Sequence, residues 1–245
     1  MDFILRKNAA PVYAFLSLIN TMGISETLKG KKILDCGAGG ILPPLILFQQ
    51  HGFDCWGIDM SDEQIMKAKE FCDKHGGKLN LRKGDMRHIP FGDECFDFVY
   101  EHYSMCHLSK RDTFLAVHEM RRVLKNGGLC FLGVISTDTW PKASFGVEKE
   151  AGQFWGDEND GEYTLHSMFT NEEANLLVSD WEVITKEKRV LFKQEDAQNT
   201  TFETWMELYP ESQSTLSQEA WGKQYSQRVN LFQYVHLYYV LRKPF

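Results

Sequence analysis

The chain contains 245 residues, of which 43% are hydrophobic and 25% are charged. A globular protein of this size can bury one large core, or one core with a small attached lobe. The formal net charge of −7 and the lack of a long basic run argue against a surface that follows nucleic-acid phosphates, and no stretch reaches the roughly 20 apolar residues that a membrane span requires.

A helix is the first element that the sequence predicts. Apolar residues repeat at helical spacing at Val12, Phe15, Leu16, Ile19 and Met22. The basic pair before this run could mimic a signal peptide, but no small-residue cleavage site follows it. We therefore expect an amphipathic helix that packs on the core.

The stretch ILDCGAGGILPP, residues 33–44, predicts a strand, a tight turn and a helix. The four small residues from Gly37 to Gly40 allow the backbone to approach a ligand without side chains in the way. Pro43 and Pro44 suit the first turn of a helix, where a missing N–H costs little. Such a turn directs backbone N–H groups and a helix N-terminus at a bound molecule.

Strands and helices then alternate, which is typical of a parallel sheet with helices on both faces. The predicted strands are residues 31–36, 54–59, 79–84, 96–101 and 128–135, and the predicted helices are residues 42–51, 61–75 and 110–124. We expect one α/β domain over residues 1–245, with residues 31–136 as its ligand-binding core.

The pattern changes after residue 136. The sequence predicts a loop rich in aromatic and charged residues over 137–168, a helix at 170–179 and a strand at 181–192. A polar segment of helices over 196–229 and a last strand at 231–242 follow. Within the loop, GDENDGE at 156–162 is polar and glycine-rich, so we expect it to be exposed and flexible.

Polar residues stand where the strands end, which is where open parallel sheets bind ligands. Asp59 stands at the tip of the second strand, about 20 residues after the glycine turn, at the usual position for a carboxylate that accepts hydrogen bonds from ribose hydroxyls. Ser61 is a candidate helix cap. Asp85 and Met86 end the third strand and could hold an exocyclic amine and cover a purine, although Asp85 could also simply cap a turn.

The segments ILDCGAGG, GIDMS, KGDMRHIPFGDECFDFVY and EMRRVLKNGGLCFLGV resemble the successive motifs of class I S-adenosylmethionine-dependent methyltransferases, in order. The resemblance covers residues 31–136 well and the final strands weakly. It implies a Rossmann-like, mostly parallel sheet of seven strands with the last one antiparallel. It also implies that S-adenosylmethionine contacts Asp35, Gly37, Ala38, Gly39, Gly40, Asp59, Met60, Gly84, Asp85, Met86 and Glu101.

The turn departs from the usual pattern of this family in one respect. The third glycine of the motif is replaced by Ile41. A pyrophosphate needs the closest backbone approach, whereas S-adenosylmethionine carries no phosphate. The departure therefore disfavours a dinucleotide more than it disfavours this cofactor.

The end of the fourth strand holds the candidate catalytic residues Glu101, His102 and Tyr103. Methyl transfer needs alignment of the acceptor and, for some acceptors, a base, and His102 has the most useful pKa range near neutrality. These residues could instead form only the pocket wall. We expect Cys106 and His107 to pack beneath the following helix, and their spacing from His102 matches no standard zinc site.

The acceptor pocket is predicted under the segments outside the core. Aromatic residues gather there at Trp140, Phe145, Phe154, Trp155, Tyr163, Trp205, Tyr209, Trp221 and Tyr225, and they could either wall an apolar pocket or form a small local core. We expect residues 137–168 and 196–229, with the N-terminal helix, to form a mobile cover over the site.

The favoured function is methyl transfer from S-adenosylmethionine to a small-molecule acceptor. Two alternatives stay open: a methyltransferase of tRNA or protein, and a noncatalytic cofactor-binding subunit that activates a partner. Six cysteines without a CxxC pair predict reduced thiols and a cytoplasmic protein. The sequence predicts no metal site and leaves the oligomeric state and the acceptor atom open.

Overall fold

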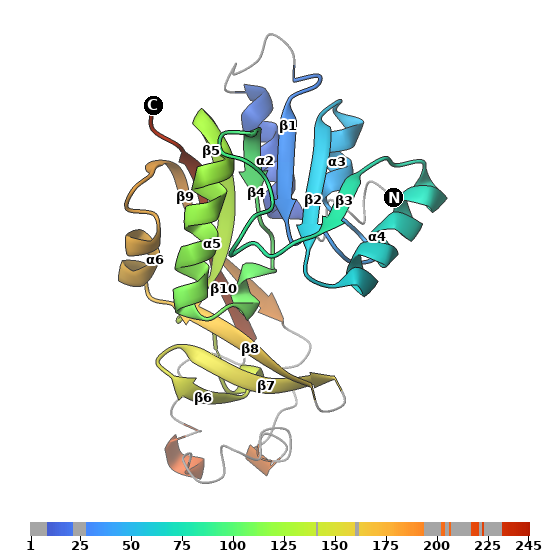
Figure 1. The fold of residues 1–245 in the computed structure, drawn as a ribbon. Helices are drawn as coiled ribbons and strands as arrows, with labels where there is room; N and C mark the ends of the chain where they lie inside the picture. The colour runs from blue at the N-terminus through green and yellow to red at the C-terminus, as the bar shows by residue number, and fades with distance from the viewer. Residues whose placement is uncertain are drawn as a thin grey trace.

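The computed structural model describes residues 9–21, 28–140, 142–159, 162–193 and 232–245, and the shorter pieces 202–203, 206, 217–220 and 222. It is an α/β fold in which helices cover both faces of one sheet, with a smaller β unit at one end (Figure 1). Most of the predicted polar segment 196–229 lies outside the described residues.

Seven strands form the main sheet in the order β3, β2, β1, β4, β5, β10, β9. Their bounds are β1 Lys32–Cys36, β2 Asp54–Asp59, β3 Asn80–Lys83, β4 Phe96–Tyr100, β5 Leu124–Ser136, β9 Glu182–Lys193 and β10 Phe232–Arg242. The first five are parallel, and β10 runs antiparallel to both β5 and β9. The predicted seven-stranded sheet with its last strand antiparallel is therefore confirmed.

Two groups of helices enclose this sheet. On one face lie α2 (Ala10–Thr21), α3 (Leu45–Gln50) and α4 (Asp62–His75), and on the other lie α5 (Lys110–Val123) and α6 (Asn171–Leu177). The predicted amphipathic helix is confirmed in α2, which buries Val12, Phe15, Leu16 and Ile19. Met22 lies outside the described residues. None of the helices described is long and apolar enough to cross a membrane.

The prediction of a loop over residues 137–168 is wrong. After a short 3-10 helix, η2 (Lys142–Phe145), this segment forms an antiparallel unit of β6 (Val147–Glu150), β7 (Gln153–Asn159) and β8 (Glu162–Phe169). Most of the supposed flexible loop at 156–162 belongs to β7 and β8, because the polar run is the end of a hairpin. The unit joins the main sheet where β8 pairs with the end of β5, beyond the start of α5 in Figure 1.

Candidate active site

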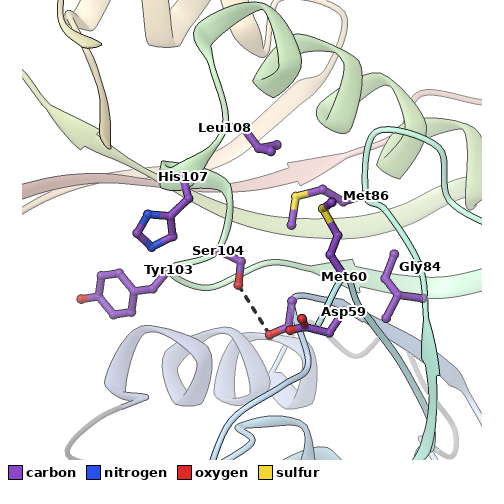
Figure 2. Close-up of a pocket in the computed structure, with 10 residues that line it drawn as sticks. Asp59, Met60, Gly84, Met86, Tyr103, Ser104, His107 and Leu108 are labelled. Carbon is purple, nitrogen blue, oxygen red and sulfur yellow. Dashed lines mark hydrogen bonds between the residues drawn. The ribbon is translucent and has the colours of Figure 1, made fainter. Parts of the chain in front are cut away.

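A cleft with two connected lobes opens at the carboxyl ends of β1, β2 and β4. The smaller lobe, about 280 Å³, has Met60 and Met86 on one side and Tyr103 and His107 on the other (Figure 2). The larger lobe, about 540 Å³, extends along the glycine turn to α3 and α2. Both lobes share Gly37, Asp59, Tyr103, Ser104 and His107, so they form one continuous site.

The glycine turn has the tight geometry that the sequence predicts. Gly37 and Gly40 adopt φ of 121° and 95°, which favour glycine. A Cβ atom on Gly39 would lie 2.5 Å from Asp59 Oδ2 and 2.5 Å from Gln64 Cβ, so this position has no room for a side chain. The three glycines line the larger lobe, whereas Ala38 is buried beneath them.

Asp59, at the tip of β2, connects the turn to α4. Its Oδ2 accepts a hydrogen bond from Gly39 N at 3.0 Å, and its Oδ1 accepts one from Ser61 N at 2.9 Å. Ser61 caps α4 as predicted, since its hydroxyl accepts from Gln64 N. Each carboxylate oxygen can accept a further bond, and Asp59 lines both lobes, where a ligand hydroxyl would reach it.

Asp35 lies beneath the turn and not on the cleft wall. It is 2% exposed, and its Oδ2 accepts a 2.6 Å hydrogen bond from the Tyr100 hydroxyl. Burial raises the pKa of Asp35 to about 8, with the carboxylates of Glu101 and Asp59 acting in the same direction and the Tyr100 bond opposing them. Its position supports a role in shaping the turn.

Of the three predicted contact residues in the turn after β3, two line the cleft and one does not. Gly84 and Met86 line the smaller lobe. The Asp85 carboxylate instead accepts bonds from the Arg87 backbone and guanidinium at 2.7–3.0 Å, and these bonds lower the pKa of Asp85. Arg87 also pairs with Asp112, so Asp85 ties this turn to α5.

Glu101 is fully buried and accepts three backbone hydrogen bonds. Its Oε2 accepts from Ser104 N and Met105 N at 3.3 and 3.1 Å, and its Oε1 accepts from Gly133 N at 3.0 Å. Burial raises the pKa of Glu101 and the three bonds oppose that rise. The carboxylate thus anchors the segment after β4 to β5, and its geometry gives no support to a role as a base.

His102 and Tyr103 lie on the cleft wall, as predicted for candidate catalytic residues. His102 borders the larger lobe, and Tyr103 borders both. Burial, followed by the neighbouring His236 and Arg189, lowers the pKa of His102 to about 4. The expectation of a pKa near neutrality is therefore wrong: the imidazole is neutral at pH 7, but it is a weaker base than an exposed histidine. The Tyr103 hydroxyl accepts a 3.1 Å hydrogen bond from the Tyr238 hydroxyl of β10.

The prediction that Cys106 and His107 pack beneath the following helix is wrong. They belong to a short 3-10 helix, η1 (Met105–His107), in which His107 is exposed and borders both lobes. Cys106 packs against the small core of Ile135, Phe154 and Met168 at the base of the hairpin. The position of His107 on the cleft could not be predicted, because η1 has only three residues and gives no periodic pattern in the sequence.

Other site residues were not predicted from the sequence. Ser104 donates a 3.5 Å hydrogen bond to Gly37 O, drawn as the dashed line in Figure 2, and joins the segment after β4 to the glycine turn. Gln64 borders the larger lobe from α4. His236 and Tyr238 approach from β10. The sequence predicts the final strand that carries them, but nothing in that strand indicates which residues its side chains contact.

The β6–β8 unit is hydrogen-bonded to the cleft wall. The Ser167 hydroxyl donates to Leu108 O at 2.6 Å, His107 Nδ1 lies 3.1 Å from Leu165 O, and Gln153 Oε1 accepts from Lys110 N at 3.0 Å. Phe145 and Phe154 do not line either lobe, because they belong to the small core at the hairpin base. Of the predicted pocket aromatics, Trp205, Tyr209, Trp221 and Tyr225 lie outside the described residues.

The cleft fits S-adenosylmethionine in its chemistry. A turn without room for side chains offers backbone groups, Asp59 offers a carboxylate to hydroxyls, and Met60, Met86 and Leu108 offer an apolar slot for a flat ring. Lobes of about 280 and 540 Å³ are in the usual size range of small-molecule sites. The residues described contain no cluster of three or more His, Cys, Asp or Glu that could hold a metal ion.

Comparisons with known proteins agree with this geometry. Residues 34–132 match the family model described as a methyltransferase domain. Sterol 24-C-methyltransferase of Pneumocystis carinii is 35% identical over 111 residues, which cover 44% of this chain and 28% of that protein. Methyltransferase GfsG of Streptomyces halstedii is 32% identical over 101 residues, which cover 40% and 36%. The matched region therefore spans about a third of these curated relatives.

A solved structure extends the likeness to nearly the whole chain. The SAM-dependent methyltransferase from Methanosarcina mazei superposes with a TM-score of 0.61 at 19% identity, over 88% of this chain and 93% of that one. At this identity the superposition shows a shared fold.

Proposed function

We propose that this chain, whose residues 34–132 match the methyltransferase domain model, is a class I S-adenosylmethionine-dependent methyltransferase that transfers a methyl group from that cofactor to a small-molecule acceptor. One observation carries the proposal. Asp59, at the tip of β2, faces both lobes of a cleft that has a side-chain-free glycine turn on one side and an apolar methionine-lined slot on the other.

Different residues of the cleft would contact different parts of the cofactor. The N–H groups of residues 37–40 already donate to Ile58 O, Asp59 Oδ2 and Gln64 O, so backbone carbonyls of this turn would accept bonds from the amino group of the cofactor. Asp59 would accept bonds from the ribose hydroxyls. Met60 and Met86 would cover the adenine faces. When bound, the cofactor supplies a methyl group on a cationic sulfonium, whose sulfur keeps the electron pair of the bond that breaks.

His102 is the residue best placed to serve the acceptor. Its neutral imidazole borders the larger lobe beside Tyr103, so it can accept the proton that the acceptor atom loses as it is methylated, and then pass that proton to water. We expect His102→Ala to lower turnover by about 10²- to 10⁴-fold with almost unchanged cofactor affinity. Unaltered turnover with the true acceptor would show that His102 lines the pocket and takes no part in proton transfer.

The assembly around the cleft is also part of the proposal. The chain would act as one domain, with the β6–β8 unit and residues 196–229 as a cover over the acceptor. A cytoplasmic location is supported by the six cysteines, none of which forms a disulfide. A net charge of −7 supports a small molecule over a nucleic acid as the acceptor.

Two measurements test the proposal. Calorimetry should show micromolar binding of S-adenosylmethionine and its demethylated product, and no binding of nicotinamide dinucleotides. Labelled methyl transfer should then appear with a cell metabolite extract and not with tRNA or protein. Binding of NAD alone would contradict the cofactor assignment, and transfer to tRNA or protein would contradict the acceptor class. Cofactor binding without any transfer would favour a noncatalytic subunit.

A further inference from the structure

Tyr103 stands between the two lobes in an unfavourable conformation. Its φ of 64° lies in the left-handed region, which is uncommon for a residue with a side chain. Its side chain is 41% exposed, and among the described residues its hydroxyl has one hydrogen-bond partner, Tyr238. Strained residues of this kind persist where surrounding contacts hold them, and they gather at functional sites.

Two imidazoles lie against the Tyr103 ring, and each has one buried nitrogen without a hydrogen-bond partner among the described residues. The ring centroid is 4.1 Å from that of His102 and 5.1 Å from that of His236. His102 Nε2 and His236 Nδ1 are both buried, and neither has a hydrogen-bond partner among the described residues. A buried nitrogen without a partner is destabilising, and native proteins contain few of them. Two such nitrogens beside one strained side chain suggest that a bound ligand supplies their missing hydrogen-bond partners.

The surroundings keep both imidazoles neutral. Burial and the nearby Arg189 lower the pKa of His236 to about 4, as they do for His102. Arg189, the cross-strand partner of His236, is paired with the exposed Glu187, and the Glu101 carboxylate is occupied by backbone N–H groups. Each ring therefore carries one N–H and one free lone pair at pH 7, with no nearby carboxylate available to it.

We propose that Tyr103 is a hinged cover, and that His102 and His236 beneath it form the subsite that binds the acceptor through an atom bearing a dissociable proton. A hydroxyl, thiol or N–H group donates to an imidazole lone pair, whereas an alkene carbon leaves both nitrogens without a partner. The inference rests on the proposed function, because it names the acceptor class of the same cleft.

Tyr238 is the positioning residue that keeps the cover closed. Burial raises the pKa of Tyr238, so its hydroxyl stays protonated and donates to Tyr103. Its ring stacks on Phe131 at 5.6 Å and lies over Gly133, where a Cβ atom would come within 2.5 Å of it. The donor is thus fixed to the sheet, while the acceptor, Tyr103, is an exposed residue of the segment after β4.

The test uses two probes of nearly equal shape, phenol and toluene, which differ in the proton-bearing oxygen. Both are titrated by calorimetry into protein saturated with the demethylated cofactor. We expect phenol to bind about 2- to 13-fold more tightly, as one neutral hydrogen bond allows, and this preference to be lost in His102→Leu or His236→Leu. Nitrogen resonances of both histidines in the wild type should shift with phenol and not with toluene.

The cover is tested with a matched pair of substitutions on adjacent residues of β10. Tyr238→Phe removes the bond that holds Tyr103, so both probes should bind more tightly, again by about 2- to 13-fold, with the preference for phenol kept. Tyr239→Phe should match the wild type, because its hydroxyl faces Asn175 on the opposite side of the sheet. Tyr103→Gly, which removes both the cover and the strain, should act like Tyr238→Phe.

Each outcome has a distinct meaning. Failure to bind the demethylated cofactor would refute the proposed function. If that cofactor binds, the acceptor subsite is overturned by absent phenol binding, by equal affinity for the two probes, or by a preference that survives both leucine substitutions. Should a leucine variant not fold, unshifted histidine resonances in the wild type would overturn it instead. Equal probe affinities of Tyr238→Phe and Tyr239→Phe would overturn the proposal that Tyr103 covers the subsite.

Discussion

Replacement of Asp59 by alanine should weaken cofactor binding and also destabilise the fold. The carboxylate would accept bonds from ligand hydroxyls, and a hydrogen bond to a charged group contributes about 1.5–3 kcal/mol, which is about 10- to 150-fold in affinity. The same change also removes the bonds from Gly39 N at 3.0 Å and Ser61 N at 2.9 Å. We therefore expect weaker binding together with a loss of roughly 1–3 kcal/mol in the free energy of unfolding.

Calorimetry with the demethylated cofactor, at a temperature where all variants are folded, measures the first effect, and urea denaturation measures the second. Asp62→Ala is the matched control, since Asp62 lies three residues away, is exposed in a pair with Lys83 and does not line the cleft. Asp59→Asn keeps one acceptor oxygen and should give an intermediate affinity. Normal affinity of Asp59→Ala would show that the β2 tip does not hold the cofactor.

Three further predictions follow from buried groups and from the hairpin. Because the pKa of Asp35 is raised to about 8 in the folded state, its contribution to stability is fully present below its unfolded pKa of about 3.8 and is lost as pH rises through 8. Asp35→Asn, which still accepts from Tyr100, should therefore abolish that loss in denaturation curves measured from about pH 4 to above pH 8. Glu101→Gln should cost about 1–3 kcal/mol and impair cofactor binding, measured by denaturation and calorimetry, because an amide cannot satisfy all three backbone donors. Hydrogen exchange over 142–159 and 162–169 should slow when cofactor product and acceptor bind together, and protection equal to that of the central strands in every state would mean a rigid lobe.

The parallel core was predictable because its signals are local. Strand β2 has the same bounds as its prediction, 54–59, since a buried strand between turn residues is a short apolar run. The hairpin of β7 and β8 was missed for the converse reason. A polar, glycine-rich run can be an exposed loop or the end of two paired strands, and composition alone does not distinguish them.

The site was predictable in its cofactor half and much less so in its acceptor half. Asp59 and the glycine turn follow strands that the sequence already indicates. Tyr238 meets Tyr103 across 135 positions of the chain, so no motif joins them. Glu101 shows a second limit: the sequence places a carboxylate at the end of β4, but only the structure reveals that backbone N–H groups occupy it.

The position of β10 also constrains the order in which the protein can assemble on the ribosome. β9 ends at Lys193 and β10 begins at Phe232, yet β10 lies between β9 and β5. A nascent chain that has emerged only as far as β9 therefore has two unpaired strand edges, which are prone to wrong pairing. Its glycine turn can already form, while Tyr238 has not been synthesised. Chaperones that bind exposed edges would thus meet this protein in a state in which the glycine turn has formed and the hydrogen bond between Tyr103 and Tyr238 has not.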